Sequence, residues 1–125
     1  MKSKDQNNVF NKKLEICSEF PLTGYFRDGC CNSSKSDAGQ HIVCAVMSKK
    51  FLEFSLSKGN DLISPRPEFN FPGLKAGDKW CICIDRWLEA FANSVAPKII
   101  LAATNKSVLD KIKMEILKRF ALDIN

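Results

Sequence analysis

The sequence predicts a small α/β or α+β fold, in which a sheet of two to four strands packs with about three helices. Short apolar runs at residues 42–47 and 98–103 indicate buried strands, and amphipathic stripes between and after them indicate helices. Residues 18–40 and 60–77 are rich in glycine, proline, serine and asparagine, which predicts two long irregular loops. This order of elements is typical of a small sheet with helices packed on it.

The length of 125 residues and the 45% hydrophobic content fit one domain with one core. We expect a disordered polar tail at residues 1–8 and a single globular domain at residues 9–125, beginning with a short edge strand at 9–16. No apolar run approaches the roughly 20 residues that span a bilayer, and the first residues lack the apolar stretch of a secretory signal. We therefore expect a cytoplasmic protein with no membrane partner.

In the first half of the domain, the run IVCAVM at residues 42–47 is β-branched and apolar, which predicts a buried strand. Ser48 is the expected N-cap of the helix that follows, and Gly59 is expected to end that helix. The loop at residues 60–77 contains three prolines, which stiffen it.

In the second half, Asp78 is the expected N-cap of a helix over residues 79–93. Apolar residues recur there at spacings of three and four, which is the stripe of an amphipathic helix. The alternation of Cys81 and Cys83 would also suit a strand, but the stripe continues for three turns beyond them and favours the helix. The members of this stripe are Trp80, Ile84, Trp87, Leu88 and Phe91.

The chain is expected to end with a second buried strand at residues 98–103 and a last helical region. Thr104 is the expected cap of that region, which extends to Phe120 and breaks near Lys113.

The net charge of +5 does not by itself indicate nucleic-acid binding. Four lysines and one aspartate in residues 1–13 supply more than half of it, and no basic stripe interleaved with aromatic residues follows. A small-molecule or protein partner is therefore favoured over nucleic acid. The six cysteines are expected to be reduced thiols, because the chain shows no secretory signal.

Cys81 would lie in the first turn of the expected helix, where the helix dipole favours a thiolate, although Asp78 opposes that effect. Cys30 and Cys31 are adjacent in the loop FRDGCC, so one of them could be a metal ligand while the other faces away. In each case the alternative is a buried cysteine that only fills the core.

His41 is the only histidine. On the expected strand it would point to the opposite face from Cys44, unless it precedes the strand. A zinc site built from Cys30 or Cys31, His41, and Cys81 or Cys83 has suitable donor atoms, but its spacing matches no standard pattern. The alternative is a histidine with a structural role.

Four long segments together resemble a bacterial family known as domain of unknown function 2237, over about residues 9–121. They are PLTGYFRDGCC, HIVCAVMSKKFLEFS, GNDLISPRPEFNFPGLKAGDKWCICIDRWLEAF and APKIILAAT. The family pattern includes Asp37, Gly39 and His41, together with all six cysteines. Its members usually carry a His-Glu pair where this chain has Asn105 and Lys106, so a mechanism that needs a second histidine there does not carry over. The resemblance implies one stand-alone domain and brings no activity.

The leading functional hypothesis is a cysteine-centred pocket for metal binding or thiol and redox chemistry, formed where the two long loops meet over the sheet. Its candidate site residues are Cys30, Cys31, Cys81, Cys83 and His41, supported by Arg27, Asp28 and Asp78. The alternative is a non-catalytic binding module, in which the proline-stiffened loop at residues 64–77 presents Arg66, Glu68 and Phe71 to a protein or small molecule. A hydrolase has little support, because the chain has one histidine and no nucleophile motif.

Overall fold

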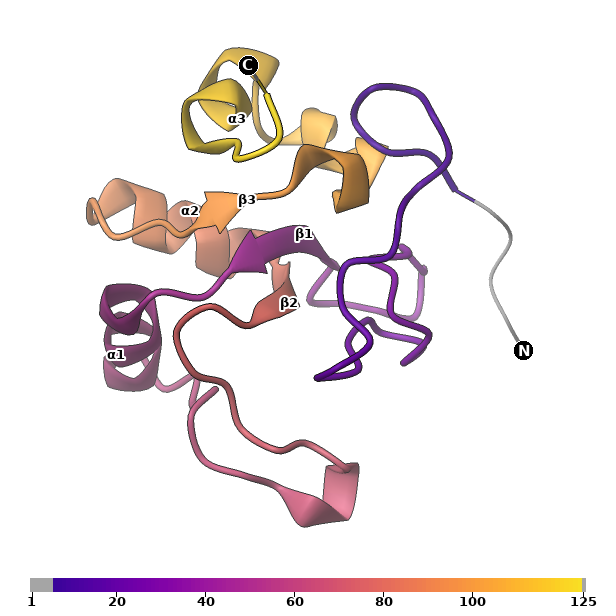
Figure 1. The fold of residues 1–125 in the computed structure, drawn as a ribbon. Coiled ribbons are helices and arrows are strands. Elements are labelled where there is room, and N and C mark those ends of the chain that lie inside the picture. The colour runs from indigo at the N-terminus through magenta and orange to yellow at the C-terminus, as the bar shows by residue number, and fades with distance from the viewer. Residues whose placement is uncertain (1–5, 125) are drawn as a thin grey trace.

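The computed structural model of the chain describes residues 6–124 and confirms a small α+β fold. Its centre is a three-stranded antiparallel sheet with the strand order β2-β1-β3 (Figure 1). The strands are β1 (His41–Val46), β2 (Lys79–Cys83) and β3 (Lys98–Ile99). Because β1 lies between the other two strands and both of its faces are covered, its four inner residues are apolar and buried.

The described part of the chain contains the α-helices α1 (Lys49–Ser57), α2 (Ile84–Ala92) and α3 (Met114–Phe120). Ser48 is confirmed as the N-cap of α1, because its hydroxyl oxygen accepts a hydrogen bond of 3.1 Å from the N–H of Phe51. Gly59 follows the end of α1 with a φ of 86°, a left-handed conformation that favours glycine.

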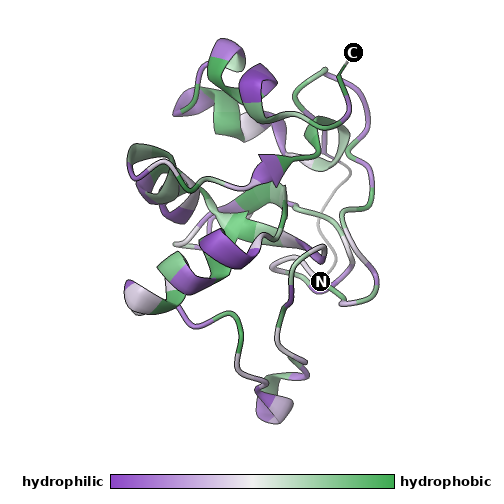
Figure 2. Cartoon of the chain, turned by 60° about the vertical axis from the view of Figure 1, so that its left-hand side comes forward, coloured by the Kyte–Doolittle hydropathy of each residue, from purple (hydrophilic) through white to green (hydrophobic). Residues whose placement is uncertain are grey.

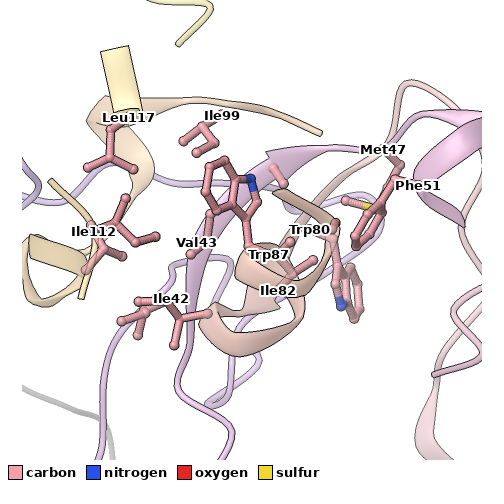
Figure 3. Close-up of a cluster of buried hydrophobic side chains, with 14 of the residues drawn as sticks. Ile42, Val43, Met47, Phe51, Trp80, Ile82, Trp87, Ile99, Ile112 and Leu117 are labelled. Atoms are coloured by element: carbon pink, nitrogen blue, oxygen red, sulfur yellow. The ribbon is translucent and has the colours of Figure 1, made fainter. Parts of the chain in front are cut away.

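The main hydrophobic core joins the sheet to the helices. Trp87 of α2 is fully buried in it, and Figure 3 shows this ring among side chains from the sheet and from the α3 end of the molecule. Val43 and Ala45 of β1 and Trp80 and Ile82 of β2 belong to the same core. Figure 2 accordingly shows hydrophobic segments at the middle of the molecule, while the helices around them carry both hydrophilic and hydrophobic residues.

A second buried cluster contains two strand residues that lie between these in the sequence. Cys44 of β1 and Cys81 of β2 lie in it, together with Cys17 and Cys31 from the irregular N-terminal part of the chain. Since successive side chains of a strand point to opposite faces, this cluster lies on the other face of the sheet. The long irregular segment before β1, which carries Cys17 and Cys31, covers that face. In Figure 1 it lies beside the sheet on the side of the N-terminus.

The helix predicted over residues 79–93 is wrong for its first five residues, which form β2. Pairing with β1, which is distant in the sequence, stabilises these β-prone residues as a strand. Asp78 is therefore not an N-cap: its carboxylate accepts a hydrogen bond of 3.0 Å from the N–H of Lys75 in a turn. The helix begins at Ile84 without a side-chain cap.

The edge strand predicted at residues 9–16 is also wrong, because this segment is a turn closed by an isolated bridge between Asn7 and Lys13. The strand predicted at 98–103 is correct only for β3. After it the backbone N–H groups of Leu101 and Ala102 donate to the carboxylate of Asp123, at 2.8 and 2.9 Å, in place of a ladder partner.

The last helical region is confirmed as broken before α3, which begins just after Lys113. Its cap was misplaced by one residue: Asn105, not Thr104, accepts from the N–H of Ser107, at 3.0 Å. Residues 1–5 of the expected tail lie outside the described residues, and Gln6 accepts a hydrogen bond of 2.8 Å from the N–H of Ser33. In the described part of the chain, every helix is too short or too polar to cross a membrane.

Candidate functional site

Four cysteines from four separate segments converge on the loop-covered face of the sheet. The structure joins them in two disulfides, Cys17–Cys44 and Cys31–Cys81. The sulfur atoms of Cys17, Cys31 and Cys81 all lie within 4.8 Å of one another, so the two disulfides are neighbours. All four cysteines are at most 3% exposed. The expectation of reduced thiols is therefore wrong for these four, because pairs separated by 27 and 50 residues are brought together only by the fold.

The loop that carries Cys17 and Cys31 is fixed by short polar contacts. The N–H of Cys17 donates to the carbonyl of Gly29 at 2.8 Å. The carboxylate of Asp28 accepts from the N–H of Cys30 and from the side-chain amide of Asn32, both at 3.0 Å. Asp28 thus shapes the turn that places Cys31 against the sheet.

Two buried threonine hydroxyls satisfy the backbone of the strand cysteines. Thr104 accepts from the N–H of Cys44 at 3.1 Å, and Thr23 accepts from the N–H of Cys81 at 2.9 Å. Both threonines are fully buried. An unpaired buried N–H is costly, so these contacts help to hold both strand cysteines in position.

A hollow of about 250 Å³, which we call the Arg27 hollow, opens beside the Cys31–Cys81 disulfide. The guanidinium carbon of Arg27 lies 5.5 Å from the ring centre of Trp80, a cation–π contact that places this cation at the hollow. Trp80 is itself held edge-to-face against Phe71, with ring centres 5.2 Å apart. The hollow is lined by Thr23, Gly24, Tyr25, Arg27, His41, Trp80 and Cys81.

His41 at the rim of this hollow is oriented by a buried carboxylate. Its Nδ1 lies 2.8 Å from Oδ1 of Asp37, and its backbone N–H donates to Oδ2 of the same residue at 2.8 Å. An ionised carboxylate only accepts, so Nδ1 carries the proton and Nε2 remains an acceptor in the neutral ring. The His41 side chain is 44% exposed, whereas that of Asp37 is 2% exposed. Gly39 leaves room for the ring, because a Cβ there would lie 2.6 Å from Cε1 of His41.

A second hollow of about 200 Å³, the Arg86 hollow, is also lined by His41 and Trp80. Cys83, which is half-buried, lines it. The positive charge at this hollow, that of Arg86, is partly neutralised. Its guanidinium donates to the carboxylate of Glu89 at 3.3 Å and to the carbonyl of Lys58 at 3.2 Å. Arg27 donates to the carbonyl of Leu22 at 3.5 Å, whereas Arg86 pairs with a carboxylate, so the Arg27 hollow offers the less neutralised positive charge of the two.

The sequence-family comparison covers nearly the whole domain. The family described as an uncharacterized protein conserved in bacteria (DUF2237) matches residues 7–121. The chain belongs to this family. Among curated proteins, none matches the chain significantly. DUF2237 membership thus confirms the resemblance seen in the sequence and assigns no reaction.

The candidate site residues divide into three groups in this DUF2237 protein. Cys31, Cys81, His41 and Arg27 are brought together around the Arg27 hollow. Cys30 and Cys83 are half-buried and lie outside the two disulfides. Asp78 lines a different hollow, with Phe20 and the turn at Gly73. Among the described residues, the side chains close enough together to hold one metal ion are Cys17, Cys31 and Cys81, and this group does not include His41.

The candidate binding loop is exposed at Arg66 and Glu68, but Phe71 is buried against Trp80 and so belongs to the core. Sequence reasoning missed Cys17 and Cys44 as members of the sulfur cluster. It also missed Asp37 as the partner of His41, although both residues belong to the DUF2237 pattern.

Proposed function

We propose that this protein carries out thiol–disulfide exchange at the Cys31–Cys81 disulfide, reached through the Arg27 hollow, with a thiol that carries a negative charge. The observation that supports this proposal is the position of Cys81. Cys81 is 2% exposed and lines a hollow that also contains a cation and an oriented imidazole, whereas its partner Cys31 is fully buried and does not line it. An incoming thiolate has to attack the accessible sulfur of a disulfide.

The exchange proceeds in two balanced steps. In the first, the incoming thiol gives its proton to Nε2 of His41 and attacks the sulfur of Cys81. The Cys31–Cys81 bond breaks, and Cys31 leaves as a thiolate that takes up a proton. In the second, another thiol attacks the external sulfur of the mixed disulfide and Cys81 leaves as a thiolate that takes up a proton, which releases an external disulfide and leaves two protein thiols. Two external thiols are oxidised and one protein disulfide is reduced.

The charge around the hollow supports an anionic substrate. Arg27 contributes a guanidinium that the Trp80 ring holds without neutralising it. A planar guanidinium binds a carboxylate in a bidentate manner, so a thiol with a carboxylate group would be held close to Cys81. The buried Asp37 is separated from this ligand by the His41 ring that it orients, because its own side chain is only 2% exposed.

The accessibility of Cys81 can be tested with a matched pair of variants. In a background that carries Cys30→Ser and Cys83→Ser, Cys31→Ser leaves Cys81 as a single thiol and Cys81→Ser leaves Cys31. Because only Cys81 lines the hollow, we expect a small aromatic disulfide reagent to label the Cys31→Ser variant at least tenfold faster in the native state. Equal labelling of both variants would reject the hollow as the route of attack.

The charge preference can be tested on the unmodified disulfide. We expect a carboxylate-bearing thiol to reduce Cys31–Cys81 faster than a neutral thiol of the same pKa, in buffer that contains a chelator. Arg27→Gln should remove this advantage while leaving the rate with the neutral thiol nearly unchanged. Absence of any advantage in the unmodified protein would reject the anionic substrate class.

A second candidate function, a binding module, is favoured by the exposure of Phe20. This side chain is 95% exposed and borders an apolar groove of about 540 Å³. The loop prolines Pro65, Pro67 and Pro72 form part of the groove, so little entropy would be lost when an apolar segment of a partner protein covers it.

This candidate predicts that Phe20→Ser reduces co-purification of a partner with the chain. Leu56→Ser, at an exposed apolar residue of α1, is the matched control. If both variants retain the same partners as the unmodified chain, the groove is not a docking site.

A further inference from the structure

The same four cysteines have a second chemistry available when they are reduced. We propose that the thiolates of Cys17, Cys31, Cys44 and Cys81 bind one zinc ion in a closed tetrathiolate site. Thiol exchange at the Arg27 hollow involves one disulfide and no metal. The zinc site instead involves all four cysteines of the two disulfides. It is inferred from the positions of their sulfur atoms.

The sulfur positions are close to those of a tetrahedral site. A Zn–S distance of about 2.3 Å places neighbouring sulfur atoms about 3.8 Å apart. The sulfur atoms of Cys17, Cys31 and Cys81 already lie within 4.8 Å of one another, and the fourth, from Cys44, is bonded to Cys17. After both disulfides are reduced, side-chain rotations that separate the bonded sulfur atoms would bring all four around one ion, and Cys44, which is not in that group of three, has to move toward it.

Half of this site is built into the sheet. Cys44 and Cys81 are Cα partners in the antiparallel pairing of β1 with β2, so their side chains lie beside each other on one face. Their backbone N–H groups are fixed by the threonine hydroxyls described above. Such supporting contacts orient metal ligands and are part of most metal sites.

The loop provides the other half of the site. Gly29 accepts from the N–H groups of both Cys17 and Ser18, at 2.8 and 3.1 Å, which ties the two loop cysteines to the same turn. The side-chain amide of Asn105 donates to the carbonyl of Cys31 at 3.1 Å. The loop therefore presents its two sulfur atoms together.

The donor set and the burial select the metal and its role. Four sulfur donors in a tetrahedral arrangement favour zinc over magnesium or calcium, which prefer oxygen ligands. Four thiolate ligands fill a tetrahedral coordination sphere, so no position on the metal would be left open to water or substrate. Closed sites of this kind contribute to folding and not to catalysis.

The conversion balances with a phosphine as the reductant. For each disulfide, one phosphine and one water yield one phosphine oxide and two thiols, so two phosphines produce the four thiols. Binding of one Zn²⁺ then releases four protons and forms the tetrathiolate. The affinity should therefore fall steeply as the pH is lowered.

The test uses the full chain, reduced with a phosphine and freed of metal under an inert atmosphere. We expect it to bind one equivalent of Co²⁺ with the absorption of a tetrahedral cobalt tetrathiolate and the release of about four protons, and Zn²⁺ to displace the cobalt without further proton release. The Cys30→Ser/Cys83→Ser variant should give the same spectrum, whereas Cys44→Ser should lower the affinity at least tenfold.

Two results would overturn the zinc site: a reduced chain that binds no Co²⁺ or Zn²⁺, and a cobalt spectrum lost in the Cys30→Ser/Cys83→Ser variant. The second result comes from a variant that keeps all four proposed ligands, so it does not depend on whether Cys44→Ser folds. Thiol exchange is measured separately in the presence of chelator, so failure of one proposal is distinguishable from failure of the other.

Discussion

Removal of each disulfide should destabilise the protein by an amount that the loop lengths allow us to estimate. Cys17–Cys44 closes a separation of 27 residues and Cys31–Cys81 one of 50. The chain-entropy relation for cross-links then gives about 3.5 kcal/mol for the first and about 4 kcal/mol for the second. The Cys17→Ala/Cys44→Ala and Cys31→Ala/Cys81→Ala variants should lose these amounts of unfolding free energy.

The assay is urea unfolding followed by tryptophan fluorescence, in buffer that contains a chelator. Cys83→Ala, which removes a half-buried thiol outside the disulfides, is the control and should change the unfolding free energy by at most about 1 kcal/mol. A loss below about 1 kcal/mol in both double variants would refute the reasoning, because it would mean that the loop is held to the sheet without the disulfides. If only one of the two double variants loses unfolding free energy, the disulfide removed in that variant is the one that holds the loop to the sheet.

Three further predictions test the core, the loop and the site. Trp87→Phe should cost about 1–3 kcal/mol in urea unfolding, because the indole N–H that donates to a buried carbonyl at 3.1 Å is lost. Hydrogen bonds from the Ser64 hydroxyl and from backbone N–H groups lower the pKa of Asp61 below its ordinary value of 3.8. Their contribution to stability is therefore fully present above pH 3.8 and is lost as the pH falls through the lower pKa of the folded state. An NMR titration should show the lowered pKa, and Ser64→Ala should move it back toward 3.8. Gly39→Ala should displace the His41 ring, visible in its NMR shifts, and slow exchange at Cys81.

The elements that local patterns determine were predictable from the sequence. β1 and α1 lie close to the predicted residues, because an apolar β-branched run and a serine cap act within a few residues. β2 was not predictable in this way. Trp80 happens to lie four residues before Ile84 and so extends the helical stripe, while pairing with β1 decides the conformation. A contact between distant segments overrides a local pattern.

The candidate site shows the same division between local and distant information. The local turn FRDGCC drew attention to Cys30 and Cys31, with Arg27 beside them, whereas Cys81 was singled out by an expected helix start that the structure replaces with β2. The pairing of the cysteines depends on which strands are neighbours and on how the loop folds back, and the chain itself contains no spacing that encodes this. Cys17 and Cys44 were therefore missed until the two faces of the sheet were known.

The two faces of the sheet are stabilised by different means, and this links the chemistry of the cysteines to folding. One face packs against α2 through a large apolar core, while the sulfur cluster on the other face has few apolar neighbours, chiefly Ala103 and Ile100. The two disulfides together contribute roughly 7–8 kcal/mol, which is comparable with the 5–15 kcal/mol of a typical domain. A chain that loses both would be close to unfolding, unless another link joins the loop to the sheet. Zinc bound to the same four sulfur atoms would be such a link, so oxidation and metal binding become alternative ways to hold the same loop in place.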